Sequence, residues 1–196
     1  MRLCETQKAD EEFTIKRERK NTMISQVFRS TWLAAAIAIS GSVFVSARAE
    51  DNEKNLTALA AALKDAKVSL GDGLKASERE GKPVSAKFEI DDGKLQLSVY
   101  TMKADGFAEV VIDPKTGAIA KAEKITDAED LEAAATQKAA MEKATTSLFA
   151  ATQKAVMANA GYQAVSITPE MKEGHPAADI TLLLGETVKN VAEKLD

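Results

Sequence analysis

The amino-acid sequence predicts an α+β protein built from two similar halves, each a helix or helix pair followed by an antiparallel β-meander. Two observations lead to this fold class. The spacing of apolar residues changes twice from three or four positions to two, after Gly81 and again after Gly161. Turn sequences rich in Gly, Asp and Pro separate the segments in which apolar and polar residues alternate. Helices followed by such strands are typical of an antiparallel sheet with helices packed on one face.

The first 49 residues are expected to lie outside the fold. Between Thr31 and Val45 the chain is uncharged and apolar, and it continues into Ala47-Arg48-Ala49. An apolar run that ends in an A-x-A site is typical of a secretory signal peptide, here cleaved after Ala49. The alternative is an uncleaved anchor, but the run is shorter than the roughly 20 apolar residues that a bilayer core requires. We therefore expect a periplasmic or secreted protein without stable membrane insertion after cleavage.

Translation is expected to start at Met23 rather than at Met1. Residues 1–22 contain five acidic side chains and no apolar run, which does not fit the beginning of a signal peptide. Residues 23–49 then form the signal peptide, and residues 1–22 are upstream sequence without a function.

The chain after residue 49 is acidic and lacks cysteine. Of 26 basic and 30 acidic residues, eight and five lie in residues 1–49, so their removal changes the net charge from −4 to −7. This charge disfavours nucleic acid and anionic membrane surfaces as partners. Because Cys4 is the single cysteine, disulfides, thiol catalysis and thiolate metal sites are excluded from the expected mature domain.

Residues 50–126 are expected to form the first half of the fold. Apolar residues three and four positions apart predict helical segments from Asn55 to Gly81, with a break near Ser69. Alternating residues and short turns then predict four strands, at Val84–Ile90, from Lys94 to Thr101, at Phe107–Ile112 and at Ala118–Ile125. The expected core brings Val84, Phe88, Ile90, Leu97 and Val99 together with Leu59, Leu63 and Leu70.

Residues 127–196 are expected to repeat this order in a degenerate form. Asp127–Ala160 is rich in alanine and helical. The segments Ala178–Gly185 and Val188–Leu195 align with the last two strands of the first half. With that alignment, the middle hairpin of the second half has shrunk to Pro169–Pro176.

The stretch from Ser69 to Ile125 resembles a PepSY domain. Its last hairpin, Val110-Val111-Ile112-Asp113-Pro114-Lys115-Thr116-Gly117-Ala118-Ile119, is close to the family pattern Val-x-Val-Asp-x-x-Thr-Gly-x-Ile. A fainter second copy extends from Ser147 to Leu195, so the chain resembles a secreted or periplasmic bacterial protein with tandem PepSY domains, the second degenerate. The resemblance implies a noncatalytic module that binds a polypeptide and regulates or inhibits a peptidase in the cell envelope. It implies no catalytic residue, and we expect no cofactor.

The hairpin that carries the resemblance is expected to have a structural role. Asp113 is placed to accept hydrogen bonds from backbone amides two residues further on, and Gly117 supplies a positive φ. The structural motif is therefore expected to consist of Asp113, Pro114, Thr116 and Gly117.

The strand after the first turn is the expected contact surface for a polypeptide partner. Main-chain pairing along a free strand edge gives affinity, and exposed alternate side chains give selectivity. If this strand is an edge, the contacting residues are Gln96, Ser98 and Tyr100.

Residues suited to catalysis or metal binding are sparse. His175 is the single histidine and lies in a polar loop, where we expect it to be exposed and without a role. Glu89, Asp91 and Asp92 lack the ligand spacing of an EF-hand loop, so a solvated turn is expected there. We expect a protein that is not an enzyme. The alternative is a small periplasmic hydrolase or small-ligand-binding protein that uses carboxylates or a Ser-Lys pair, and a deep cleft with converging carboxylates would favour it.

Overall fold

The structure is a computed structural model that describes residues 46–196, with side chains described from Asn55 onward. The chain divides into two compact units, residues 1–43 and 44–196, and the description below concerns the second. The predictions for residues 1–22, and those for the signal peptide as far as residue 45, lie outside the described residues.

Helices precede each group of strands. The first group follows α2 (Ser46–Leu63), α3 (Leu70–Ser77) and a single 3₁₀ turn, η1 (Glu78–Glu80). The second follows α4 (Ala128–Lys143) and α5 (Leu148–Ala158). Side-chain oxygens cap the first turns of α3, α4 and α5, at Ser69, Asp127 and Ser147. Within residues 46–196, no helix is both long enough and apolar enough to span a membrane.

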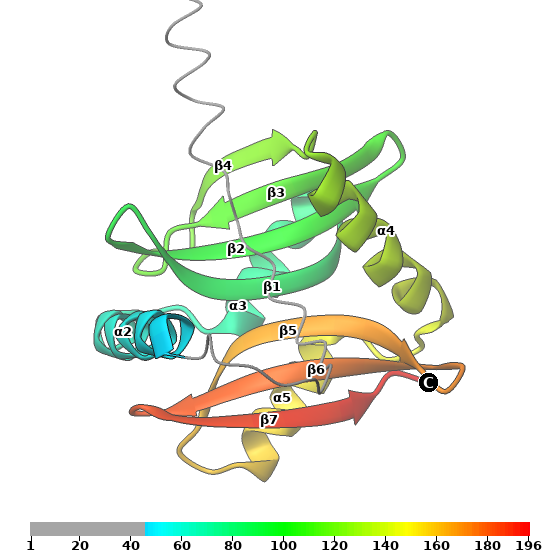
Figure 1. Cartoon of the computed structure of the whole chain (residues 1–196). Coiled ribbons are helices and arrows are strands. Elements are labelled where there is room, and N and C mark those ends of the chain that lie inside the picture. Colours follow the sequence, from blue (N-terminus) through cyan, green and yellow to red (C-terminus); the bar gives the residue numbers. More distant parts are fainter. Residues whose placement is uncertain (1–45) are drawn as a thin grey trace, which may run out of the picture. The chain divides into compact units, whose positions relative to one another are not determined.

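The strands form one antiparallel sheet in the order β4-β3-β2-β1-β5-β6-β7 (Figure 1). The first group is β1 (Lys82–Asp91), β2 (Lys94–Lys103), β3 (Gly106–Ile112) and β4 (Ile119–Lys124). The second group is β5 (Gln163–Lys172), β6 (His175–Leu184) and β7 (Thr187–Lys194). Two meanders therefore run outward from the central pair β1 and β5, and β4 and β7 are the edges. The predicted α+β fold class, helices followed by antiparallel meanders, is confirmed.

Three strands of each half repeat at a constant interval along the sequence. β1, β2 and β3 begin at Lys82, Lys94 and Gly106, and β5, β6 and β7 begin at Gln163, His175 and Thr187, each the same number of positions later. The register shift between Pro83 and Ser85 recurs after the same interval, between Ala164 and Ser166. Ala86 and Ile167, a pair that joins the halves, are also separated by this interval. An approximate twofold axis therefore relates the two halves and passes through this pair.

The predicted alignment of the two halves is wrong for the strands. Residues 169–176 are not a shrunken hairpin, because Pro169 lies in β5 and Pro176 in β6. β6 is the equivalent of β2 and β7 that of β3, so among the described strands β4 is the one without a counterpart. Pro169 is tolerated because β1 and β5 pair only at residues 86–87 and 166–167, so the sheet needs no ladder bond from its nitrogen on that side.

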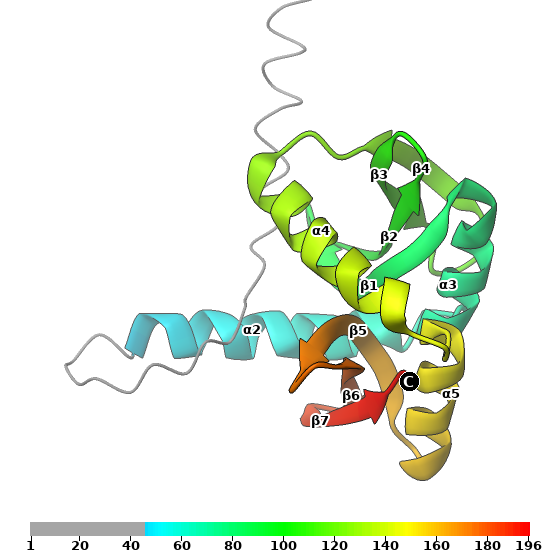
Figure 2. The same ribbon diagram turned by 90° about the vertical axis from the view of Figure 1, so that its right-hand side faces the viewer.

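Helices pack on both faces of the sheet. α3 and α5 cover one face and α4 crosses the other (Figure 2). Gly73 lets α3 approach β2 closely, since a Cβ there would collide with Leu97 Cδ2. On the other face, the buried Ser85 hydroxyl donates to Gln137 Oε1 of α4 at 2.7 Å.

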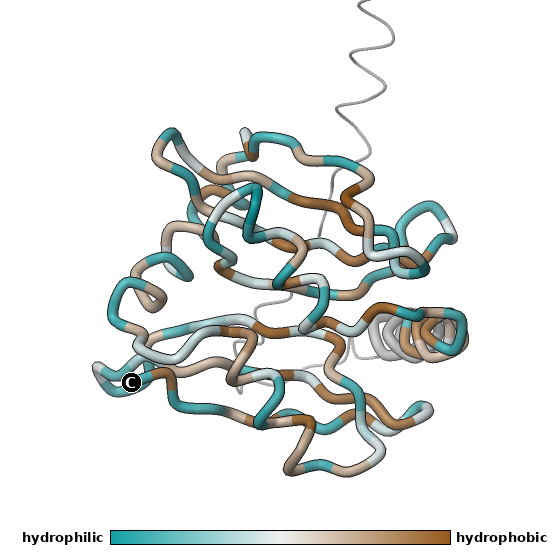
Figure 3. Tube along the Cα trace, turned by 180° about the vertical axis from the view of Figure 1, so that it is seen from behind, coloured by the Kyte–Doolittle hydropathy of each residue, from teal (hydrophilic) through white to brown (hydrophobic). Residues whose placement is uncertain are grey.

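Hydrophobic residues lie along the strands, whereas hydrophilic residues gather at the turns between them (Figure 3). Most of the predicted core is buried, namely Val84, Phe88, Leu97, Val99, Leu63 and Leu70. Ile90 and Leu59 are only partly buried.

Candidate functional site

The outer edge of β7 presents backbone groups that no strand of the described chain pairs. Leu184 and Thr187 close the two-residue turn of the β6–β7 hairpin, and Leu195 N–H donates to Pro176 O at 2.9 Å. Hydrogen-bonded and non-hydrogen-bonded pairs alternate between these two points. The residues that direct their N–H and C=O groups outward are therefore Val188, Asn190, Ala192 and Lys194.

Side chains of β7 on the α5 face are fixed by α5 and the residue after it. Lys189 Nζ donates to Asn159 Oδ1 at 2.5 Å, and Glu193 Oε2 lies 2.5 Å from Lys154 Nζ. Glu193 is 14% exposed, whereas Lys154 is 71% exposed. These contacts hold the strand against α5, so its backbone edge is preorganised for pairing.

Apolar side chains lie exposed at the hairpin end of this edge. Leu184 is 47% exposed and Val188 42% exposed. Large exposed apolar side chains close to an unpaired strand are the combination that proteins usually avoid at sheet edges.

The opposite edge, β4, is shorter and better protected. β4 has six residues against eight in β7, and its pairing with β3 is interrupted by a register shift between Val111 and Ile112. Lys121 and Glu123 form an ion pair of 2.7 Å on it. Short length and irregular register disfavour the addition of a further strand. Of the two edges, β7 is therefore the candidate for binding.

The expectation that Gln96, Ser98 and Tyr100 are exposed on a free edge is wrong. β2 lies between β1 and β3, Ser98 is fully buried and Tyr100 is 2% exposed. The expectation is wrong because it depends on the strand order. β3 and β4 lie on the outer side of β2, and no residue pattern within β2 indicates this.

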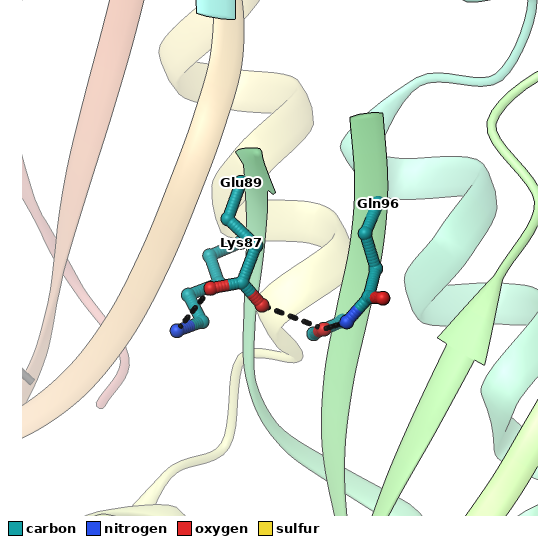
Figure 4. Close-up of polar contacts among 4 residues, drawn as sticks. Lys87, Glu89 and Gln96 are labelled. Carbon is teal, nitrogen blue, oxygen red and sulfur yellow. Dashed lines mark hydrogen bonds and ion pairs between the residues drawn. The ribbon is translucent and has the colours of Figure 1, made fainter. Parts of the chain in front are cut away.

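Gln96 and Ser98 instead belong to a polar network on the sheet face away from α3 and α5 (Figure 4). Gln96 Nε2 donates to Ser98 Oγ at 2.8 Å, and Ser98 Oγ donates to Glu89 Oε1 at 2.9 Å. Glu89 Oε2 also lies 2.7 Å from Lys87 Nζ. The network ties β1 to β2 and satisfies buried polar atoms.

Glu109 on β3 is the incompletely satisfied member of this region. Its Oε1 is buried and has no hydrogen-bond partner. Burial raises the pKa of Glu109 above its ordinary value, and the charge on Glu89 raises it further, while the Ser98 hydroxyl opposes the shift. Ser98 lies near both carboxylates and has one proton, which it donates to Glu89. Glu109 therefore takes up a proton at a higher pH than an ordinary glutamate does.

The hairpin residues have the structural contacts predicted for them. Asp113 Oδ1 accepts hydrogen bonds from Lys115 N at 2.9 Å and from Thr116 N at 2.8 Å, and Gly117 has φ +75°. These bonds, with that of the Thr116 hydroxyl, lower the pKa of Asp113. Pro114 O also accepts from the amides of Lys67 and Val68, which docks the hairpin onto the link between α2 and α3.

His175 is the first residue of β6 rather than part of a loop, and it has a partner. Its Nδ1 lies 2.7 Å from Asp196 Oδ2, a contact that lowers the pKa of the Asp196 carboxyl. The side chain is 71% exposed, and within residues 55–196 no hydroxyl is hydrogen-bonded to its ring. Such a pair holds two of the three groups of a Ser-His-Asp arrangement and lacks the nucleophile.

No cluster of His, Cys, Asp or Glu suited to a metal ion occurs among the described residues. Cavities do occur along the seam between the halves. One of about 460 Å³ lies beside Lys82, whose Nζ donates to Met141 O at 3.1 Å. Another, of about 370 Å³, lies between α3 and α5 beside Phe149, whose ring centroid is 3.9 Å from Lys75 Nζ. Neither brings together the converging carboxylates that the hydrolase alternative requires.

Comparison with known proteins identifies no family. No protein-family model matches the chain, and no curated protein matches it. Among solved structures, the chain is similar to the crystal structure of a putative lipoprotein from Clostridium difficile 630, with 20% sequence identity and a TM-score of 0.33. The similarity covers 66% of this chain and 95% of that chain. A likeness of this extent assigns neither a family nor a function.

Proposed function

We propose that this chain is an exported, noncatalytic polypeptide-binding protein that takes an extended segment of its partner as an added strand on β7. One observation supports this most directly. β7 is the equivalent of β3, and β3 is covered by β4, whereas no described strand lies on the outer side of β7. The outward N–H and C=O groups of Val188, Asn190, Ala192 and Lys194 are thus open to a guest strand.

The first half indicates how such a strand pairs. Ile125 N–H donates to Phe107 O at 2.9 Å, so β3 directs the backbone groups of Phe107, Glu109 and Val111 toward β4. The equivalent positions in β7 are Val188, Asn190 and Ala192, which are the residues with outward backbone groups. A guest strand on β7 therefore runs antiparallel, as β4 does on β3.

Export and the kind of partner rest on the sequence. The apolar run before Ala47-Arg48-Ala49 supports export, and the PepSY resemblance of residues 69–125 supports a peptidase of the cell envelope as the partner. Binding through the main chain needs no catalytic group in this chain.

The experiment uses β4, the strand that pairs with β3 at the position equivalent to the outer edge of β7. A fluorescent peptide with the sequence of residues 118–125, which contains β4, is titrated with the purified chain and its polarisation is measured. We expect saturable binding. Ala192→Pro removes one outward N–H without touching the β6 ladder, so it should abolish binding. Ala192→Val keeps the N–H and should bind as the unsubstituted chain does.

The controls separate binding from folding and from catalysis. Both variants should retain the thermal unfolding midpoint of the unsubstituted chain to within a few degrees, because Ala192 is exposed on an edge strand. No saturable binding by the unsubstituted chain, or equal binding by the proline variant, would overturn the proposal. Turnover of generic peptide or ester substrates that disappears in His175→Ala would instead establish the hydrolase alternative.

A further inference from the structure

We propose that β7 pairs with β7 of a second copy of this chain, antiparallel and about a twofold axis at Val191, so that one sheet continues through both copies. The proposal rests on the proposed function, because it uses the same outward backbone groups. It also names a partner for that edge: the chain itself covers β7 when no other strand does.

Backbone geometry restricts the ways in which two copies can pair. Outward-directed residues of one strand must meet outward-directed residues of the other, since only these have N–H and C=O groups available. The twofold axis can then pass through Asn190, Val191 or Ala192 while keeping most of the strand paired. With the axis at Val191, Asn190 faces the second copy's Ala192 and Val188 faces its Lys194.

Charge selects the register centred on Val191. In that register Lys189 lies opposite Glu193 of the second copy, and the symmetry generates this pair twice. With the axis at Asn190, Lys189 faces Val191 and Glu193 faces Thr187; with the axis at Ala192, Lys189 faces Leu195 and Glu193 faces Val191. Among the residues of β7 itself, only the central register places opposite charges across from each other, and cross-strand pairs of opposite charge stabilise antiparallel strands.

The side chains around the pair fit this arrangement. Lys189 and Glu193 both point to the α5 face, where Asn159 and Lys154 already hold them. Among the described residues, Lys154 contacts Glu193 at Oε2 only. The other carboxylate oxygen, Oε1, is left to accept a hydrogen bond from Lys189 of the second copy. Val191, in the middle of the charged pairs, meets its own symmetry copy and is covered. Val188 is exposed in the single chain, and the aliphatic part of Lys194 of the second copy covers it in the pair.

Charge reversal with rescue is the test. Sedimentation velocity of the purified whole chain over a dilution series should show a monomer–dimer equilibrium. Lys189→Glu and Glu193→Lys each place like charges opposite each other twice, so each should weaken the dimer about ten- to thirtyfold. The double variant restores opposite charges and should recover most of the affinity. Ala192→Pro should abolish dimerisation, and Ala192→Val should not.

Each outcome decides the matter. A monomer at all concentrations overturns self-pairing, and so does a double variant that dimerises no better than the two single variants. Glu193→Lys also loses the contact with Lys154, so its unfolding midpoint is measured alongside. Binding of the peptide of residues 118–125 is measured separately on the same samples. A chain that binds this peptide but never dimerises refutes self-pairing and leaves the proposed function intact, whereas a chain that dimerises but does not bind the peptide refutes the proposed function as stated.

Discussion

The two halves of the sheet share a backbone plan but end differently. Residues 82–112 and 163–193 repeat strand for strand, including the two-residue turns Asp92-Gly93 and Glu173-Gly174, whose four residues all have positive φ. The first half then continues into β4, which covers the outer edge of β3, whereas no described strand covers the outer edge of β7. The candidate binding surface therefore lies in the second half.

The comparison also shows what duplication conserves. Equivalent positions of the two halves carry different side chains, such as Ala86 and Ile167 on the axis or Glu109 and Asn190 at the third strand of each half. Turn geometry and register are kept while the residues change. Turns and bulges need a few particular backbone conformations, whereas buried positions accept any apolar side chain that fills the volume.

The largest expected effect tests whether the halves unfold as one unit. They share the β1–β5 pairing and the contact between α3 and α5. Leu97→Ala in the first half and Ile180→Ala in the second each remove a fully buried side chain and should lower the free energy of unfolding by about 2–5 kcal/mol. Both should shift a single transition followed by circular dichroism in urea. Two transitions, each moved by only one of the variants, would show that the seam does not couple the halves.

Much of the fold follows from the sequence because local periodicity reports it. The alternation around Val84 to Ile90 and the turns that contain Gly93 and Gly117 place the strands of the first half to within a few residues. The duplication is also visible. The alignment of the two halves is not visible, because a proline usually indicates the end of a strand. Pro169 and Pro176 nevertheless lie inside β5 and β6.

The candidate site could not be predicted because strand order is not local. Gln96, Ser98 and Tyr100 alternate as residues on an exposed strand do, yet their strand is interior. Gln96 bonds to Ser98, and Ser98 bonds to Glu89. The signal that was missed is the constant interval between equivalent positions of the two halves. Applied to the turns, it corrects the alignment of the two halves and makes β7 the equivalent of β3.

An intermediate effect sharpens the difference between the two central strands, β1 and β5. Ser85 and Ser166 occupy equivalent positions, but Ser85 is buried and donates to the buried Gln137 of α4, whereas Ser166 is only partly buried. Ser85→Ala leaves Gln137 Oε1 without its donor and should cost about 1–3 kcal/mol in the free energy of unfolding. Ser166→Ala should change it by no more than about 0.5 kcal/mol. Equal losses in the two variants would show that α4 does not distinguish the halves.

The smallest expected effect concerns Glu109, whose equivalent in the second half is the uncharged Asn190. Burial raises the pKa of Glu109, so its carboxyl stays protonated in the folded chain at pH values where it has lost its proton in the unfolded chain. The free energy of unfolding therefore falls as the pH rises from the ordinary value of 4.5 through the raised one. Glu109→Gln removes the proton-binding group and keeps the size, so its stability relative to the unsubstituted chain should increase across that interval and then stay level. We expect the total change to be smaller than that of Ser85→Ala, and urea unfolding of both chains at a series of pH values measures it. A difference between the two chains that does not vary with pH would mean that Glu109 ionises in the folded chain as it does in the unfolded one.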